Sequence, residues 1–382
     1  MSRMKSLWII SLAMMVMTYA STITPTSTLA QSPAPQAPRT VTVLVGGGQD
    51  TTVLDTFFPL TLRVRVGDTV TWKFSGEPIN RHTVTFADGS IPGPKDPIAG
   101  GGPGEVLPGR WVPVPGGGPG ELMRNPVIAA PTRRPGAPVE TYDGATYINS
   151  GEVSTRPRIP GMPVNDTFSL TFTKPGVYRY YCAIHRPHMV GTIEVVPATV
   201  ADVPDQAEID KRAKAEMGHL LTLIGKAKEQ TKALRSLPGP NGTTFWFVRS
   251  GGYELSSGEL RGLTFDFLPK TLTIKAGDTV IWESVDGHTV TFIPTPPAPE
   301  VFIVKPQADA YPLLIRNPKI WQPAKPAGVY DPAQHFNSSV IGQTAPAGIS
   351  WALTFDKPGV YEYICGFHHE MGMKGTITVV ER

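Results

Sequence analysis

The sequence predicts a mainly β protein made of two β-sandwich domains in tandem. Segments such as Leu60–Val66 alternate apolar and polar residues with the period of two that is typical of a half-buried strand. Glycine (39) and proline (40) make up about a fifth of the 382 residues and separate these segments as turns and loops. A pattern centred on Cys182 returns around Cys365, and the length exceeds that of a usual single core. One structural unit is therefore used twice.

The two copies share the same order of elements. Each begins with an alternating segment that reaches a Gly-Asp turn, and a second segment that returns to Trp72 or Trp282, which predicts a β-hairpin. Further alternating segments follow on each side of the two cysteines. The hairpin turns and later segments are Gly67-Asp68, Phe168–Phe172 and Gly191–Val195 in the first copy, and Gly277-Asp278, Ile349–Phe355 and Gly375–Val379 in the second. We expect the domains to span residues 41–199 and 241–382.

Residues 200–240 are expected to link the domains through an α-helix. Asp205 and Glu208 have the spacing of a capping box, and the helix is predicted to continue to about Ser236. Its apolar residues fall on one side, as expected for an amphipathic helix: Ile209, Ala213, Met217, Leu220, Leu221, Ile224 and Ala227. We expect this side to pack on one or both domains. A helix that binds a partner is the alternative.

A long Gly/Pro-rich insertion lies in each copy, between an upstream histidine and the cysteine. The insertions share two short patterns, Arg124–Ile128 with Arg316–Ile320 and Ile148–Ser150 with Phe336–Ser338. The insertion therefore belonged to the unit before it was duplicated, and order is favoured over disorder. The tract from Gly100 to Gly118 has no counterpart in the second copy.

The N-terminus indicates export. Residues 1–30 combine Arg3 and Lys5 with an apolar run and small residues, as in a secretory signal peptide, and residues 31–40 are expected to be a flexible spacer. An uncleaved N-terminal anchor is the alternative. No later apolar stretch predicts a membrane span. Without Arg3 and Lys5, the 35 basic side chains become 33 against 32 acidic ones, so nothing suggests a nucleic-acid partner. We expect a secreted or periplasmic protein.

Soft-metal ligands gather in the loop that follows each cysteine. Cys182, His185 and Met189 lie in the first loop, and Cys365, His368 and Met373 in the second. Upstream, His82 and His288 share a strand face with large apolar residues, which would turn them toward the core. A thiolate, two imidazoles and a weak thioether form the ligand set of blue-copper electron-transfer sites. The sequence predicts one copper in each domain and no disulfide, because the only two cysteines would both be metal ligands.

Each loop contains a second candidate for the axial ligand. His185 and Met189 are four residues apart, whereas His368 and Met373 are five apart. Aligning Gly191 with Gly375 still selects Met189 and Met373. His188 and Met371, each three residues after its loop histidine, are the alternatives.

The chain resembles two cupredoxins in tandem, similar to plastocyanin and pseudoazurin. The resemblance rests on Tyr178–His185, on Tyr361–His368 and on the strands that carry His82 and His288. It implies Greek-key sandwiches, type-1 copper sites and redox partner proteins whose identity the sequence does not give. It also implies that Tyr178 and Tyr361 are structural tyrosine corners.

The sequence favours an electron carrier over an enzyme. Related copper nitrite reductases and laccases need a further copper, whose ligands include a histidine directly before the cysteine, where this chain has Tyr181 and Ile364. No His-x-His motif occurs. We therefore expect an electron-transfer protein cycling between Cu(I) and Cu(II), with no catalytic residues. Copper delivery or storage is the first alternative, and a two-domain copper oxidoreductase is the second.

Overall fold

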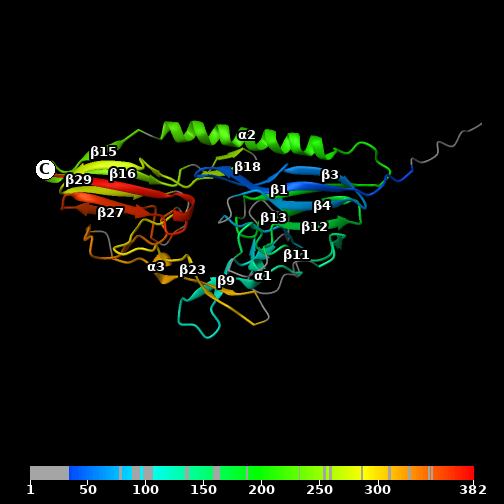
Figure 1. Cartoon of the computed structure of the whole chain (residues 1–382), viewed down its shortest axis with the longest axis horizontal. Helices are drawn as coiled ribbons and strands as arrows, with labels where there is room; N and C mark the ends of the chain where they lie inside the picture. The colour runs from blue at the N-terminus through cyan, green and yellow to red at the C-terminus, as the bar shows by residue number, and fades with distance from the viewer. Residues whose placement is uncertain are drawn as a thin grey trace, which may run out of the picture. The chain divides into compact units, whose positions relative to one another are not determined.

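We describe the chain from a computed structural model (Figure 1). The structure describes residues 34–76, 80–87, 95–97, 106–133, 137–157, 164–185, 188–231, 233–252, 255–257, 260–284, 287–308, 311–325, 328–342, 345 and 347–382. The predicted signal peptide and the first residues of the predicted spacer lie outside this part, as do residues 100–105 of the glycine-rich tract. Residues 35–382 form one compact unit.

Two sheets enclose the first core. The larger contains, in spatial order, β10 (Glu140–Tyr142), β12 (Thr167–Phe172), β4 (Thr69–Phe74), β1 (Thr40–Gln49), β2 (Thr52–Phe58), β18 (Leu260–Thr264) and β17 (Leu255–Ser257). The smaller contains β11 (Ile148–Asn149), β5 (Thr85–Phe86), β13 (Gly176–Tyr181), β14 (Val190–Val196) and β3 (Thr61–Arg65). Strands β1 and β4 pair in parallel, as do β3 and β14. We call this the first sandwich.

The second sandwich repeats this order. One sheet contains β15 (Arg235–Pro238), β16 (Thr244–Ser250), β21 (Asp278–Glu283), β27 (Ser350–Phe355) and β25 (Gly328–Val329), with β19 (Phe267–Leu268) paired to β16. The other contains β20 (Thr271–Lys275), β29 (Lys374–Val380), β28 (Gly359–Ile364), β22 (Thr291–Phe292) and β26 (Phe336–Asn337). Strand β16 pairs in parallel with β21, and β20 with β29. The expected mainly β fold with sandwich architecture is confirmed.

Each core is centred on equivalent aromatic side chains. Trp72 and Tyr180 are fully buried, with ring centroids 5.2 Å apart, and Trp282 and Tyr363 repeat the contact at 5.3 Å. A Cβ on Gly191 would lie 2.2 Å from the Tyr180 ring, so only glycine fits there. Gly375 has the same relationship to Tyr363, at 2.3 Å. The hydroxyls of the two predicted corner tyrosines donate to a carbonyl four residues upstream, Tyr178 to Lys174 (2.8 Å) and Tyr361 to Lys357 (3.0 Å).

The two copies of the unit meet at two strand pairings. Strand β18 of the second copy pairs antiparallel with β2 of the first, and thereby extends the larger sheet of the first sandwich. The insertions form a four-stranded sheet together, in the order β23 (Phe302–Lys305), β24 (Leu313–Arg316), β9 (Leu122–Arg124) and β8 (Trp111–Pro113). A short hairpin, β6 (Lys95–Pro97) and β7 (Val106–Pro108), completes the strands. Strands β17 and β18 therefore follow the predicted boundary at residue 241 in sequence but belong to a sheet of the first sandwich.

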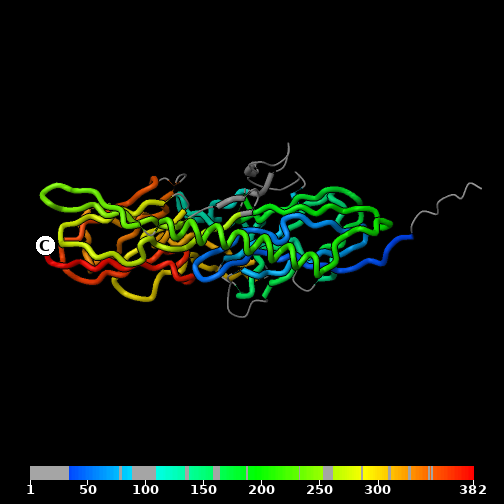
Figure 2. Tube along the Cα trace, turned by 90° about the horizontal axis from the view of Figure 1, so that it is seen from above, coloured from blue at the N-terminus to red at the C-terminus, as the bar shows by residue number. Residues whose placement is uncertain are grey.

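Helix α2 (Gln206–Gln230) lies over the strands near this junction (Figure 2). Asp205 caps its start by accepting a hydrogen bond from the Glu208 amide (2.8 Å). Its buried residues belong to the predicted apolar stripe and include Leu220 and Ile224, which pack against Leu54 and other residues of β2. The interpretation of the stripe as a packing surface is confirmed. No helix among the described residues is both long and apolar enough to cross a bilayer.

The predicted end of this helix, near Ser236, is wrong. The helix ends at Gln230, and Arg235–Pro238 forms β15 on the edge of β16. The apolar stripe ends at Ala227, so nothing beyond it anchors another helical turn. Arg235 instead lies over the Phe247 ring at 5.0 Å and pairs with Glu283 at 3.1 Å.

Two other short helices lie in the insertions. Helix α1 (Pro126–Ala129) and helix α3 (Pro318–Trp321) each begin with proline after an asparagine, Asn125 or Asn317, whose side chain accepts a backbone hydrogen bond. These are the Arg-Asn-Pro patterns that the sequence repeats. Two 3-10 turns, Pro240–Gly242 and His369–Met371, are the remaining helical elements of the described chain.

Candidate metal centres

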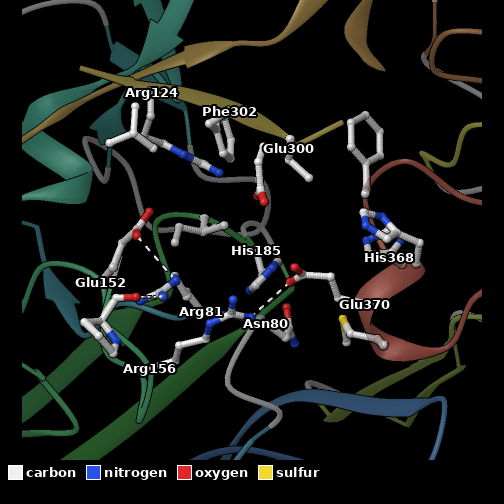
Figure 3. A pocket seen from close by; sticks show the side chains of 17 residues that line it. Asn80, Arg81, Arg124, Glu152, Arg156, His185, Glu300, Phe302, His368 and Glu370 are labelled. Carbon is white, nitrogen blue, oxygen red and sulfur yellow. Dashed lines mark hydrogen bonds and ion pairs between the residues drawn. The ribbon is translucent and has the colours of Figure 1, made fainter. Parts of the chain in front are cut away.

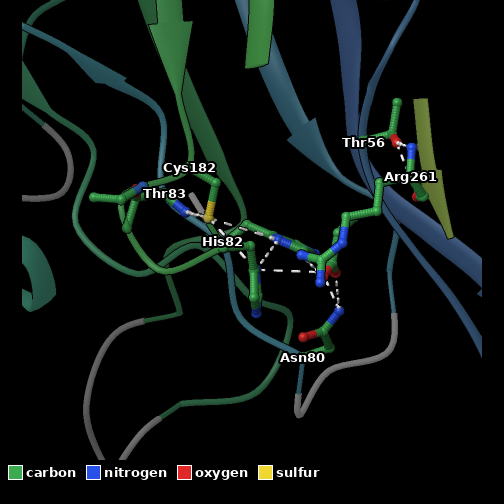
Figure 4. Close-up of polar contacts among 9 residues, drawn as sticks. Thr56, Asn80, His82, Thr83, Cys182 and Arg261 are labelled. Atoms are coloured by element: carbon green, nitrogen blue, oxygen red, sulfur yellow. Dashed lines mark hydrogen bonds and ion pairs between the residues drawn. The ribbon is translucent and has the colours of Figure 1, made fainter. Parts of the chain in front are cut away.

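The first candidate centre, site 1, consists of His82, Cys182 and His185. The two Nδ1 atoms lie 3.0 Å apart, and the Cys182 Sγ lies 3.5 Å from His185 Nδ1 and 3.9 Å from His82 Nδ1. His82 and Cys182 are fully buried, while the His185 side chain keeps 21% of its surface exposed. Figure 4 shows Cys182 and His82 meeting from different segments of the first sandwich.

Site 2 repeats this geometry with His288, Cys365 and His368. Its Nδ1 atoms lie 3.1 Å apart, and the Cys365 Sγ lies 3.4 Å from His368 Nδ1 and 3.7 Å from His288 Nδ1. In each site all three ligand atoms lie within 4.8 Å of one another. The structure thus brings together the histidines and cysteines that the sequence singled out, although 100 or 77 residues separate the upstream histidine from its cysteine.

The methionines named as axial ligands are both fully buried. Their carbonyls accept hydrogen bonds from the cysteine amides, Met189 from Cys182 (2.9 Å) and Met373 from Cys365 (3.1 Å). The alternatives differ, since His188 is exposed and Met371 is half-buried. Burial beside the thiol favours Met189 and Met373 at equivalent positions.

Each thiol is prepared to exist as a thiolate. Backbone amides donate to sulfur, from Thr83 to Cys182 (3.4 Å) and from Thr289 to Cys365 (3.5 Å). Burial raises the pKa of the Cys365 thiol, but the charge of His368 and hydrogen bonds from both site histidines outweigh it and hold this pKa well below its usual value. The pKa of Cys182 is lowered in the same way, with His185 opposing the effect of burial. Thiolate is the form that binds metal.

The insertions support the ligand loops through hydrogen bonds that both copies share. The Thr289 hydroxyl accepts from the Gly366 amide (2.7 Å) and bonds to Thr291 (3.1 Å), which donates to Asn337 (3.0 Å). The Asn337 amide group in turn lies within 3.2 Å of three carbonyls around α3. Thr83, Thr85 and Asn149 repeat this chain in the first copy. Asn149 and Asn337 belong to the repeated patterns Ile148–Ser150 and Phe336–Ser338, whose role the sequence alone did not indicate.

The surroundings of the two sites differ in one respect that the sequence analysis missed. The Asp55 carboxylate, 2% exposed, lies 3.9 Å from His185 Nδ1 in site 1. In site 2 the ring of Phe265 stacks on His368, with centroids 3.8 Å apart and planes at 5°. The sequence did contain a signal, because Asp55 is a charged residue within the largely apolar segment Val53–Phe58, where a buried carboxylate could be expected.

A cavity of about 240 Å³ is lined by the outer histidines of both sites (Figure 3). Its other walls carry Arg81, Arg124, Glu300 and Phe367 among others. Arg156 and Glu370, one from each copy, form an ion pair of 3.2 Å beside it. His185 and His368 are therefore the ligands of each site that face this shared space.

The donor sets fit copper. Each contains one soft thiolate and two imidazole nitrogens with a buried thioether nearby, a combination that suits both oxidation states of copper. Both cysteines are free, as predicted. Each site thus fits one copper ion, and the predicted cofactor is confirmed at this level.

Comparisons with known proteins agree with this donor set. Residues 255–380 match the family profile of copper binding proteins of the plastocyanin/azurin family. This match identifies the second sandwich as a cupredoxin domain. A search of curated proteins gave no significant match. The repeated strand order and ligand set indicate a second cupredoxin domain in the first sandwich.

Several solved structures are similar to parts of the chain. The oxidised plastocyanin of Dryopteris crassirhizoma is 20% identical, with 35% of this chain and 99% of that chain covered and a TM-score of 0.20. A purple cupredoxin from Nitrosopumilus maritimus is also 20% identical, with 35% and 98% covered and a TM-score of 0.19. A Cu(I) form of an amicyanin variant is 19% identical, with 44% and 95% covered and a TM-score of 0.21. With scores this low, the fold assignment rests on strand order and on the family match.

Proposed function

We propose that the chain is an exported electron-transfer protein with two type-1 copper sites. The observation that carries this proposal is the convergence, twice, of two Nδ1 atoms and one buried thiol within 4.8 Å. The proposed ligands are His82, Cys182, His185 and Met189 at site 1, and His288, Cys365, His368 and Met373 at site 2. They would lie in domains 41–199 and 241–382, with β17 and β18 contributed across the junction.

Bound copper would supply a one-electron couple between Cu(I) and Cu(II) at each site. The chain's own contribution is to keep the ligands fixed in both states. The thiolates are oriented by the amides of Thr83 and Thr289, and the loops are tied to the insertions through Asn149 and Asn337. Outer hydrogen bonds of this kind hold ligands in place and tune a metal site. A rigid site needs little reorganisation when its charge changes, which favours fast transfer.

We further propose that redox proteins, and not catalytic turnover, use these sites. The residues before the cysteines are Tyr181, which is buried, and Ile364, whose backbone pairs with Thr291. Neither can ligate a second copper in the manner of a histidine. Export through the predicted signal peptide would place the chain in the periplasm or outside the cell, and copper delivery or storage stays as the alternative.

The test is to load the full mature chain with Cu(II) and measure copper content, absorption and electron paramagnetic resonance. We expect two coppers per chain, an intense thiolate-to-copper absorption and reversible bleaching by ascorbate. A colourless protein that loses its copper readily to a chelator would support delivery or storage. Sustained turnover of nitrite or a diphenol would instead support an oxidoreductase.

A further inference from the structure

We propose that the two sites form an ordered redox pair, in which Asp55 gives site 1 the lower reduction potential and Phe265 gives site 2 the higher one. The inference rests on the proposed function, since it supposes copper at both sites. In the favoured transfer, site 1 is oxidised from Cu(I) to Cu(II) and site 2 is reduced from Cu(II) to Cu(I). One electron moves and no bond breaks.

Asp55 and Phe265 occupy the same position in the two copies. Each precedes by four residues the proline that starts the next hairpin, Pro59 or Pro269. The registers agree, because Phe58 pairs with Leu44 of β1 in the same way that Leu268 pairs with Arg249 of β16. The same backbone position therefore presents a carboxylate to one site and a phenyl ring to the other.

At site 1 the carboxylate favours the more highly charged copper. Its Oδ1 atom lies 3.9 Å from His185 Nδ1 and accepts a hydrogen bond from Asn80 (2.9 Å). Because Asp55 is 2% exposed, water screens its charge poorly. Arg261 of the second copy pairs with the other oxygen, Oδ2, at 3.6 Å, and leaves Oδ1 facing His185. Cu(II) carries one more positive charge than Cu(I), so the carboxylate lowers the potential of site 1.

At site 2 the phenyl ring favours the less charged copper. Phe265 covers one face of the His368 imidazole at 3.8 Å and also approaches His288, with centroids 5.8 Å apart. It is 5% exposed and excludes water from that face. Removing water disfavours the higher charge, and burial is one of the means by which proteins tune metal potentials. The potential of site 2 is therefore raised.

The junction brings one ligand of each site to a common cavity. His185 and His368 line the same cavity of about 240 Å³ (Figure 3). Strand β2, which contains Asp55, and strand β18, which ends just before Phe265, are hydrogen-bonded to each other. The Thr56 hydroxyl bonds to the backbone of Arg261 in both directions, donating to its carbonyl (3.0 Å) and accepting from its amide (2.9 Å), as Figure 4 shows. Electrons that enter at site 1 can thus reach site 2 within the chain.

The test is a spectroelectrochemical titration of copper-loaded, full-length variants. Cys365→Ser leaves site 1 alone, and Cys182→Ser leaves site 2 alone, so each potential is read separately. We expect the higher potential at site 2. Adding Asp55→Asn should raise the Cu(I)/Cu(II) ratio of site 1 at fixed applied potential at least tenfold, which is about 59 mV for a one-electron couple. Phe265→Leu should lower that ratio at site 2.

Two further variants make the test specific. Asp143→Asn removes an exposed carboxylate of the first copy that pairs with Lys174 (2.7 Å), and it should change neither potential. Arg261→Gln should shift site 1 in the direction opposite to Asp55→Asn, and it decides the matter if Asp55→Asn does not fold. Equal or reversed potentials, or no shift at site 1, would overturn the ordered pair while leaving the carrier intact. Loss of the copper-thiolate absorption in unmodified protein would instead reject the proposed function.

Discussion

Val53 and Leu263 hold the same position in the two copies and pair with each other across the junction. Thr52 pairs with Thr264 and Leu54 with Gly262, so the pairing is symmetric about the central pair. The insertions meet in the same way, because Met123 pairs with Ile315 and each precedes the arginine of the repeated Arg-Asn-Pro pattern. The copies thus contact each other as the subunits of a two-fold dimer would.

This symmetry makes the copies comparable residue by residue. Equivalent positions such as Asp55 and Phe265 can be compared directly, together with the neighbours that differ with them, such as Arg261 beside Asp55. Each site takes its ligands from one copy, although the copies share two sheets. We therefore expect each site to bind copper without the other.

Replacing one cysteine should remove one copper and leave the other. Cys365→Ser removes the only thiolate of site 2, so we expect one copper per chain and loss of the site 2 absorption, with site 1 unchanged. Cys182→Ser is the matched variant and should give the converse. Metal analysis and absorption spectra check both. Loss of both coppers from either variant would show that the junction makes the sites depend on each other.

The axial assignment predicts different effects for two nearby methionines. Met373 is fully buried and its amide donates a hydrogen bond to the His368 carbonyl (3.2 Å), whereas Met371 is half-buried at the cavity. Met373→Leu should shift the absorption and potential of site 2, because the axial ligand tunes both. Met371→Leu should leave them nearly unchanged. The reverse outcome would make Met371 the axial ligand.

The support given by the insertion can be tested at Asn337. Replacing it with alanine leaves buried carbonyls around α3 without this donor, which should lower the free energy of unfolding by about 1–3 kcal/mol. Urea unfolding of the metal-free protein measures the loss. Gln334→Ala, an exposed amide of the same insertion, should change stability by less than about 0.5 kcal/mol. Equal effects of the two would argue against a supporting role.

The pH dependence of the metal-free protein should report on His82. Burial lowers the pKa of His82 to about 4, although Asp55 opposes the shift. The unfolded chain, with a histidine pKa of about 6.5, binds this proton first, so stability falls as the pH drops from about 6.5 toward 4. Between pH 7 and 5 the loss from this group should be about 2 kcal/mol. Urea unfolding should show a weaker pH dependence for His82→Gln, and an unchanged dependence would contradict the buried neutral state.

Much of the site was predictable because its chemistry is local. Cys182 with His185, and Cys365 with His368, lie within one loop, and the duplicated pattern identified His82 and His288 despite their distance in sequence. Strand β2 was not predicted, since six of its seven residues are buried and it lacks the alternation of a half-buried strand. Helix α2 covers one of its faces, a tertiary contact that periodicity does not reveal.

The closeness of the two sites to one cavity could not be predicted from the sequence, for a similar reason. That His185 and His368 line one cavity depends on strand pairings between the copies, and no local pattern encodes them. The exchange of β17 and β18 into the first sandwich likewise needs the structure, because these residues follow the linker and read as the start of the second domain.

The close contact at Gly262 gives a test of this junction. A Cβ there would lie 2.1 Å from the Cδ1 atom of Ile224 in α2 and 2.9 Å from Leu54 in β2, so Gly262→Ala requires these buried side chains, or the elements that carry them, to shift. We expect a loss of about 1–3 kcal/mol, typical of overpacking. Gly225→Ala adds a methyl group on an open side of the same helix and should stabilise by up to about 1 kcal/mol. Thermal unfolding compares them, and a Gly262→Ala variant as stable as Gly225→Ala would contradict the packing of α2 on β2 and β18.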